Sequence, residues 1–376
     1  MVTQAHAARL VRRRPFAALL APLVGLVLVG LVLFWLAYNC YLAPGPFYDA
    51  FLIGLTNGAL YGLVALGYTL VYGILELINF AHGDVFMLGG MISASMILQV
   101  FHLGDHAPMG SLIPAIFASL AVAMAGCGFL NLTIEFLAYR PLRRAPRLAP
   151  LITAIGVSII LQHLAMMIWS RNPLAFPQVI KSVSYDVGGA TITNVQIGIL
   201  AISTAMMAAL AYMVYRTKLG AAMRATAQNP QVAGLMGIDI NRVIALTFVI
   251  GAALGAVAGV MVGSYYGIAH YQMGFILGLK AFSAAVLGGI GNLAGAMLGG
   301  LLLGVIEALG AGYVGDLTNL CHLSGWSEGL AERCVDNPNL TLFGSNYQDV
   351  FAFLVLIAVL VFRPSGLLGE RVADRA

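Results

Sequence analysis

Long apolar runs separated by short polar segments dominate this sequence. A helix needs about 20 residues to cross the hydrocarbon core of a bilayer. Runs near this length predict membrane-spanning helices at about 16–38, 51–74, 85–101, 111–138, 150–170, 195–215, 243–263 and 347–363, and a further apolar stretch covers 279–313. The pattern therefore predicts an all-α, polytopic transmembrane helical bundle with about nine to ten membrane segments.

The basic residues between these runs predict the orientation of the chain. Short loops rich in Lys and Arg stay in the cytoplasm. Two loops, 140–147 and 216–242, hold most of the basic residues between the runs and should both be cytoplasmic. Counting crossings from them places Arg12–Arg14 and the N-terminus inside, and places the loops near 102–110 and 171–194 outside.

The apolar stretch 279–313 is too long for one helix and short for two full spans. The loop 314–346 carries several acids against a single Arg333 and looks external, whereas the tail after Arg363 looks internal. The stretch must then cross an even number of times. We expect two short helices broken at Gly288–Asn292, or a re-entrant hairpin, because broken backbone at membrane depth is tolerated where it lines a cavity or is buried in protein.

Composition agrees with a membrane protein. The 376 residues are 60% hydrophobic and 9% charged, whereas soluble domains carry about a quarter charged residues. The net charge of +4 is too small to indicate a nucleic-acid partner. His82 and Asp84 lack the neighbours that a metal site needs, so we expect none. Cys321 and Cys334 share the external loop, where a disulfide and two free thiols both remain open.

The 44 glycines include runs at a spacing of four, which places each set on one helix face. Such ridges let helices pack closely in membranes. Besides Gly54, Gly58 and Gly62, we expect this packing at Gly251, Gly255, Gly259, Gly291, Gly295 and Gly299.

A polar segment interrupts the apolar runs between residues 73 and 84. Ionisable residues at membrane depth are costly and often mark a transport path; the same segment could equally be a solvated cytoplasmic turn. With two polar residues of the preceding helix, the candidates for a substrate path or gate are Asn57, Tyr61, Glu76, Asn79, His82 and Asp84. Glu307 is a further lone acid, structural or part of the path.

The polar loop 216–242 predicts two short helices outside the bilayer. Leu219–Gln228 suits the first, Asn229–Pro230 breaks it, and Ala233–Met236 suits the second, which Gly237 closes. Small residues and a few cations fit a groove on a partner protein. Packing against the chain's own bundle is the other interpretation.

Several of these segments together resemble a known family. The motifs Gly67–Ile74, Ile78–Asp84, Ala285–Asn292, Ala233–Ile238 and Arg242–Ala252 look like the high-affinity branched-chain amino acid permeases of bacterial ABC importers, closest to the H-type subunit. The likeness covers about 48–370. It divides the chain into an N-terminal part with an additional transmembrane helix (1–47), the permease domain (48–370) and a cytoplasmic tail (371–376).

The resemblance implies a transport subunit in the bacterial inner membrane, not an enzyme. It implies pairing with a second, M-type permease, two cytoplasmic ABC ATPases and a periplasmic amino acid binding protein, with leucine, isoleucine and valine as cargo. ATP and magnesium would belong to the ATPases, and this sequence has no G-x-x-x-x-G-K phosphate loop. The residues coupled to the ATPase would be Leu219, Gly220, Arg224, Ala225, Asn229, Pro230 and Gly237.

Three alternatives remain at this point. A permease of the same family could carry urea, amides or other amino acids. An ion-driven secondary transporter would use Glu76, His82 and Asp84 as a proton relay. A receptor or scaffold would transport nothing.

Overall fold

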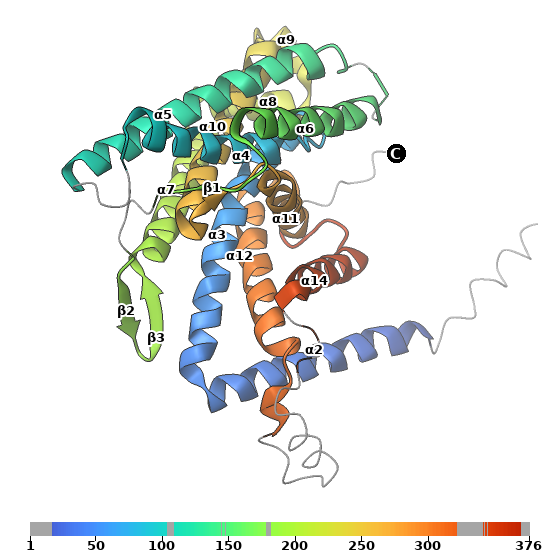
Figure 1. The fold of residues 1–376 in the computed structure, drawn as a ribbon. Coiled ribbons are helices and arrows are strands. Elements are labelled where there is room, and N and C mark those ends of the chain that lie inside the picture. Colours follow the sequence, from blue (N-terminus) through green and yellow to red (C-terminus); the bar gives the residue numbers. More distant parts are fainter. Residues whose placement is uncertain are drawn as a thin grey trace, which may run out of the picture.

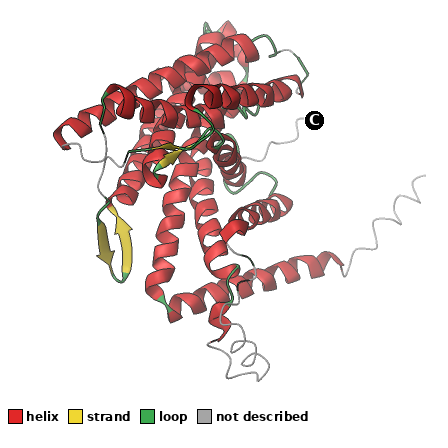
Figure 2. Cartoon of the chain, viewed as in Figure 1, coloured by secondary structure: helices red, strands yellow, loops and turns green. Residues whose placement is uncertain are grey.

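The computed structural model describes residues 17–103, 109–143, 145–146, 148–177, 182–321, 341, 343 and 345–369, and these form a helical bundle (Figures 1 and 2). Its helices are α2 (Ala17–Leu42), α3 (Pro44–Leu75), α4 (His82–Ser95), α5 (Met109–Ile134), α6 (Leu148–Trp169), α7 (Asn194–Arg216), α8 (Lys218–Gln228), α9 (Pro230–Leu235), α10 (Ile240–Tyr266), α11 (Met273–Gly288), α12 (Leu293–Leu309) and α14 (Gln348–Phe362). Three helices continue into π-helical turns, η1 (Met96–Val100), η2 (Glu135–Tyr139) and η3 (Gly310–Val314), and the 3-10 turn η5 (Ser345–Tyr347) precedes α14.

The predicted bundle is confirmed. Among the described residues, seven helices are long and apolar enough to cross a membrane, and three shorter apolar helices, Val29–Leu42, Met273–Gly288 and Gln348–Phe362, accompany them. Most predicted spans match a helix within a few residues; the largest difference is α3, which starts at Pro44 rather than near residue 51 because Pro44 suits the first turn of a helix. The basic residues Arg12–Arg14, Arg144 and Arg147, and the tail 371–376, lie outside the described residues.

Five helices, α3, α4, α10, α11 and α12, form the buried centre of the bundle. The outer helices α5, α6 and α7 expose large apolar side chains such as Phe129, Met167 and Ile197. Apolar outer surface of this kind is what lipid contact requires, since a lipid-facing helix gains nothing from polar residues.

The two ends of the bundle differ in structure. At one, named here the hairpin end (43–49, 171–177, 182–194, 267–272 and 314–319), β2 (Ser184–Val187) pairs with β3 (Ala190–Thr193), and β1 (Leu174–Ala175) pairs with β4 (Ile268–Ala269). The β1–β4 pairing confirms that 171–194 and the end of α10 share a side. The hairpin is tied to the start of α3, because Thr191 N donates to Asp49 Oδ1 at 2.6 Å.

The opposite end, named the basic end, comprises 76–81, 140–143, 145–146, 216–242, 289–292 and 363–369. Its loops contact one another: Arg143 Nη1 donates to Asn241 Oδ1 at 2.7 Å. Glu135, fully buried at the start of η2, pairs with Arg140 at 3.4 Å and with Arg143. Partial burial lowers the pKa of Arg143, and Glu135 opposes this shift. The two predicted basic loops therefore lie on the same side.

The predicted break in 279–313 is confirmed, and it separates two helices, α11 of 16 residues and α12 of 17. At about 1.5 Å per residue α11 is roughly 24 Å long, shorter than the hydrocarbon core. Gly289 and Gly291 adopt φ of 106° and 95° in the turn between them. The C-terminal segment covers this turn: Leu367 N and Leu368 N donate to the carbonyls of Leu287 and Gly288, both at 2.9 Å.

Glycines allow the central helices to approach closely. A Cβ on Gly58 of α3 would lie 2.7 Å from the Gly300 carbonyl of α12, one on Gly259 of α10 would lie 2.8 Å from Gly90 N of α4, and one on Gly295 would lie 2.5 Å from the Gly288 carbonyl. Gly299 likewise packs on the carbonyl of Ala284. The assignment of Gly291 to a helix face was wrong: it belongs to the turn, where its positive φ is the reason for glycine.

The described cysteines differ in their bonding state. Cys127 is buried and free and Cys40 is free, whereas Cys321 is disulfide-bonded. Cys334 lies outside the described residues, so its pairing with Cys321 stays a prediction.

Candidate functional site

The polar residues proposed to line a path lie in separate places. Asn57 and Tyr61 are on α3 towards the hairpin end, where Asn57 Oδ1 accepts from Tyr266 of α10 at 3.1 Å. Glu76 is exposed at the end of α3, where it adopts a φ of 52°. The other three candidates lie between α3 and the start of α4. No described hydrogen bond joins them into one chain.

His82 occupies a notch formed by glycines. It is 0% exposed, and a methyl group on Gly67 of α3 would overlap its Nε2 atom. Its Cε1 lies 3.6 Å from the position of a Cβ on either Gly251 or Gly255 of α10. The ring of Tyr68 meets the imidazole edge-on, with 4.9 Å between centroids. In α10, therefore, two glycines of the predicted ridge make room for an imidazole.

Asp84 lies one half-turn further along α4 and is also 0% exposed. It faces the start of α11, where a Cβ on Gly274 would be 2.9 Å from Asp84 Oδ1. Within the described structure neither carboxylate oxygen has a hydrogen bond of normal geometry, and neither ring nitrogen of His82 has one. Both residues are buried in the first turn of helix α4, which excludes the solvated turn for His82 and Asp84, whereas Glu76 of the same segment is exposed at the basic end.

Asn79 connects the turn between α3 and α4 to α5. Its Oδ1 accepts from the hydroxyl of Tyr139 at 2.8 Å, and both side chains are buried. Tyr139 belongs to η2, directly before the basic loop 140–146. The contact therefore links the buried polar segment to the basic end.

An ion cluster inside the bundle was missed by the sequence reasoning. Lys280 Nζ of α11 lies 2.7 Å from Glu307 Oε1 of α12 and 2.6 Å from Asp349 Oδ1 of α14. The side chains of Lys280 and Glu307 are 6% and 4% exposed, and the ammonium also lies 5.7 Å from the ring centroid of Tyr61. The signal was present in the sequence: a lone lysine and a lone acid on opposite sides of a predicted break would meet when the two helices fold together.

The loop 216–242 forms the two short helices that its sequence predicts, α8 and α9, with Gly237 at a φ of 84°. Asn229 caps α9, since its Oδ1 accepts from Gln231 N at 3.0 Å and Val232 N at 3.1 Å, and Pro230 starts that helix. The guanidinium of Arg224 turns back to the Val214 carbonyl of α7. Gly220 packs on the same carbonyl.

The large exposed apolar residues of this pair of helices lie on α9 and at the residue after it. Leu235 and Met236 are 88% and 79% exposed, and Val232 is also exposed. In Figure 1 α9 lies at the upper edge of the molecule, away from the β2–β3 hairpin. Leu219 and Ala225 are partly buried, so of the predicted coupling residues several hold α8 and α9 in place.

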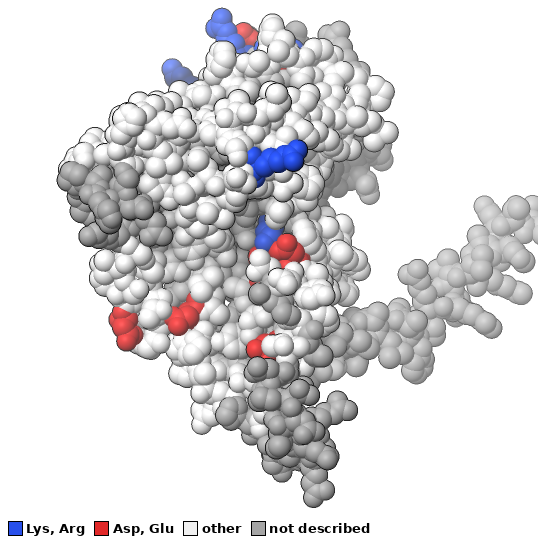
Figure 3. All heavy atoms as spheres, in the orientation of Figure 1, with Lys and Arg blue, Asp and Glu red and all other residues white. Residues whose placement is uncertain are grey.

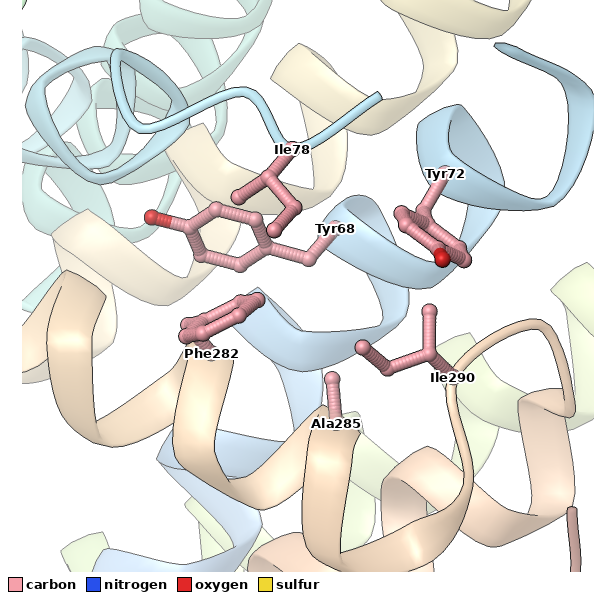
Figure 4. Close-up of a pocket in the computed structure, with 6 residues that line it drawn as sticks. All are labelled: Tyr68, Tyr72, Ile78, Phe282, Ala285 and Ile290. Carbon is pink, nitrogen blue, oxygen red and sulfur yellow. The ribbon is translucent and has the colours of Figure 1, made fainter. Parts of the chain in front are cut away.

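Two cavities differ greatly in size. Tyr68, Tyr72, Ile78, Phe282, Ala285 and Ile290 surround a gap of about 10 Å³, drawn in Figure 4, which has room for roughly one water molecule. A second cavity, of about 780 Å³, lies between α3, α5, α7 and α10 at the hairpin end. None of the six predicted path residues lines the larger one.

Comparison with known proteins identifies the family. The family model described as "Branched-chain amino acid transport system / permease component" matches residues 50–360. The chain is 43% identical over 322 residues to the high-affinity branched-chain amino acid transport system permease protein BraD of Pseudomonas aeruginosa, covering 84% of this chain and 94% of that protein. It is 39% identical, with the same coverage, to LivH of Escherichia coli K12, which has the same description.

More distant relatives extend the comparison. The Autoinducer 2 import system permease protein LsrC of an Enterobacter species is 28% identical over 270 residues, which is 64% of this chain and 76% of that protein. No solved structure matches the chain. The helical bundle and the match across most of its length show that this protein belongs to the family of branched-chain amino acid transport system permease components.

Proposed function

We propose that this chain is one of two permease subunits of an ATP-driven importer that carries leucine, isoleucine and valine across the bacterial inner membrane. The observation that supports it best is the 43% identity, over nearly the whole relative, to a permease whose name states this cargo. LsrC is named for a different cargo and is less similar to this chain. Amino acids are therefore a better candidate for the cargo of this chain than other small solutes.

The proposed orientation places the basic end in the cytoplasm and the hairpin end outside. The basic end carries Arg140, Arg143, Arg216, Lys218, Arg224, Arg242 and Arg363, whereas Arg171 is at the hairpin end together with Asp49, Asp186 and Asp316. In Figure 3 the acidic surface at lower left lies where Figure 1 draws the hairpin, and basic atoms lie at the top. The positive-inside rule favours this direction.

In this orientation α9 is the docking surface for a cytoplasmic ATPase. Apolar residues as exposed as Leu235 and Met236, at an end that otherwise carries charge, are typical of a surface that a partner covers. Gly220 and Arg224 fix α8 to α7, so a movement of α9 would be passed to a membrane helix. ATP and magnesium would be bound by two such ATPases; a second permease and a periplasmic binding protein complete the proposed complex.

Reconstitution tests this function. The chain is co-expressed with a second permease and two ATPases, the complex is placed in proteoliposomes, and uptake of radiolabelled leucine is measured with binding protein outside and ATP on the ATPase side. We expect accumulation that needs ATP and competes with isoleucine and valine, but not with urea or acetamide.

The matched control is a complex whose ATPases bind ATP without hydrolysing it. Uptake that persists in this control but collapses with a protonophore would instead identify a secondary transporter. Absence of any accumulation in the complete complex would indicate a receptor or scaffold.

A further inference from the structure

The cavity of about 780 Å³ at the hairpin end has a polar and an apolar part. Asp49 at the start of α3, Gln196 at the start of α7 and Tyr265 at the end of α10 lie where their helices reach this end. Ile199 and Val257 line the cavity one to two turns further into the bundle along the same helices. The cavity therefore changes from polar to apolar with depth.

We infer that this cavity receives the imported amino acid, with its amino and carboxyl groups at the polar part and its side chain among the apolar residues. The inference rests on the proposed function and names the place on this chain where the cargo enters. Small-molecule sites typically have volumes of about 300–1,000 Å³, mostly apolar walls and a few converging polar groups. The cavity has each of these properties.

The chemistry of the polar part selects the class of ligand. Asp49 is the one charged residue among the described residues that line the cavity, and bonds from Thr191 N and Oγ1 to its Oδ1 hold the carboxylate in place. A carboxylate attracts an amino group. The amide of Gln196 and the hydroxyl of Tyr265, 3.5 Å apart, are neutral groups that can bond a carboxylate.

The same lining argues against three other occupants. No lysine or arginine is among the described residues of the lining, so neither a phospholipid phosphate nor an acidic amino acid has a cationic partner here. The apolar depth would leave the charged end of a cationic side chain without solvent or an acid. An amino acid with a neutral, apolar side chain is the ligand that suits both the polar part and the apolar part of the cavity.

Gly198 offers a direct test because it lines the cavity on α7 and no atom lies within 4 Å of the position of its Cβ. A phenylalanine there can enter the cavity without displacing backbone. In the reconstituted complex we expect Gly198→Phe to lower leucine uptake tenfold or more while the four-subunit complex still assembles and hydrolyses ATP. Gly156 of α6 is the matched control, since it is also helical, has equally open surroundings and is outside the cavity; Gly156→Phe should keep uptake within twofold.

A second measurement detects occupancy itself. In a background with Cys40→Ala and Cys127→Ala, a Gly198→Cys variant is treated with a small methanethiosulfonate reagent, and millimolar leucine should slow labelling at least threefold whereas glutamate and lysine should not. Wild-type uptake by Gly198→Phe, or labelling that leucine does not change, would overturn the inference. A lipid that co-purifies with the wild type and is lost from Gly198→Phe, with uptake unchanged, would assign the cavity to an acyl chain. Failure of the wild-type complex to import leucine would instead reject the proposed function.

Discussion

At the scale of single residues, the structure explains why polar side chains are tolerated in the centre of this bundle. His82 fits against α3 and α10 because Gly67, Gly251 and Gly255 have no side chains. Lys280 is surrounded by two carboxylates and the face of Tyr61. In each case the neighbours are shaped or charged to fit one residue, so changing a neighbour should matter as much as changing the residue itself.

The notch around His82 leads to a prediction about Gly67. Gly67→Ala would place a methyl group where Nε2 of His82 lies, and overpacking of this kind costs roughly 1–3 kcal/mol. We expect a lower melting temperature of the detergent-solubilised protein, measured by fluorescence-detected size exclusion after heating. Gly73→Ala on the same helix, whose nearest neighbour would be 3.9 Å away, should have little effect. Adding His82→Ala to Gly67→Ala should restore part of the lost melting temperature. If it restored none, the close packing of His82 against Gly67 would be contradicted.

The ion cluster leads to a second prediction. Lys280→Met removes the ammonium that neutralises Glu307, and leaving one partner of a buried ion pair uncompensated costs about 3–5 kcal/mol. The same heating assay should show strong destabilisation, partly reversed by adding Glu307→Gln. Lys218→Met, at an exposed lysine, is the control. A destabilisation equal in the single and double variants would mean that the charge of Glu307 is not responsible.

At the scale of elements, helix ends and turns determine what each segment does. The break at 289–292 is held by two glycines of positive φ and by the segment 363–369. The α8–α9 pair is held to α7 through Gly220 and Arg224, and its large exposed apolar residues lie on α9 and at Met236. In the loop 216–242, α8 is therefore the part fixed to the membrane helix α7, and α9 is the part whose apolar residues are available to a partner.

A prediction about the ATPase follows from this division. Leu235→Arg combined with Met236→Arg should abolish co-purification of the ATPases and lower leucine uptake at least tenfold, because arginine cannot enter an apolar groove. The helix should remain, since neither side chain packs inside the bundle. Val187→Arg, at an apolar residue 63% exposed at the other end, is the control. If the double variant still co-purified with the ATPases, the docking surface could not be on α9.

At the scale of the whole molecule, the asymmetry between its two ends predicts how the protein lies in the membrane. In intact cells, a membrane-impermeant maleimide should label a Val187→Cys variant and leave a Leu235→Cys variant unlabelled until the membrane is opened, both in a background lacking Cys40 and Cys127. The expected order follows from the basic residues that surround α9. The reverse order would overturn the proposed orientation.

Much of the fold follows from periodicity and charge counting, since lipid requires long apolar helices and internally satisfied backbone. The break in 279–313 and the two helices of 216–242 also follow from the sequence, because proline, glycine and asparagine determine the backbone conformation of adjacent residues. The separate positions of Asn57, Asn79 and His82 could not be predicted in this way. Side chains on one face of a helix can point to different partner helices, and the partners are distant in sequence.

Local chemistry in the sequence by itself determined membrane residence, the helices, their breaks and the family motifs. Only the tertiary structure decided that Lys280, Glu307 and Asp349 meet, that Arg224 bonds back to the Val214 carbonyl of α7, and that the large cavity is lined by Asp49, Gln196 and Tyr265. The physical reason is that these arrangements depend on how distant helices cross. The angles and positions at which helices cross are set by side-chain packing across the bundle, and this packing cannot be predicted from a local pattern along the chain.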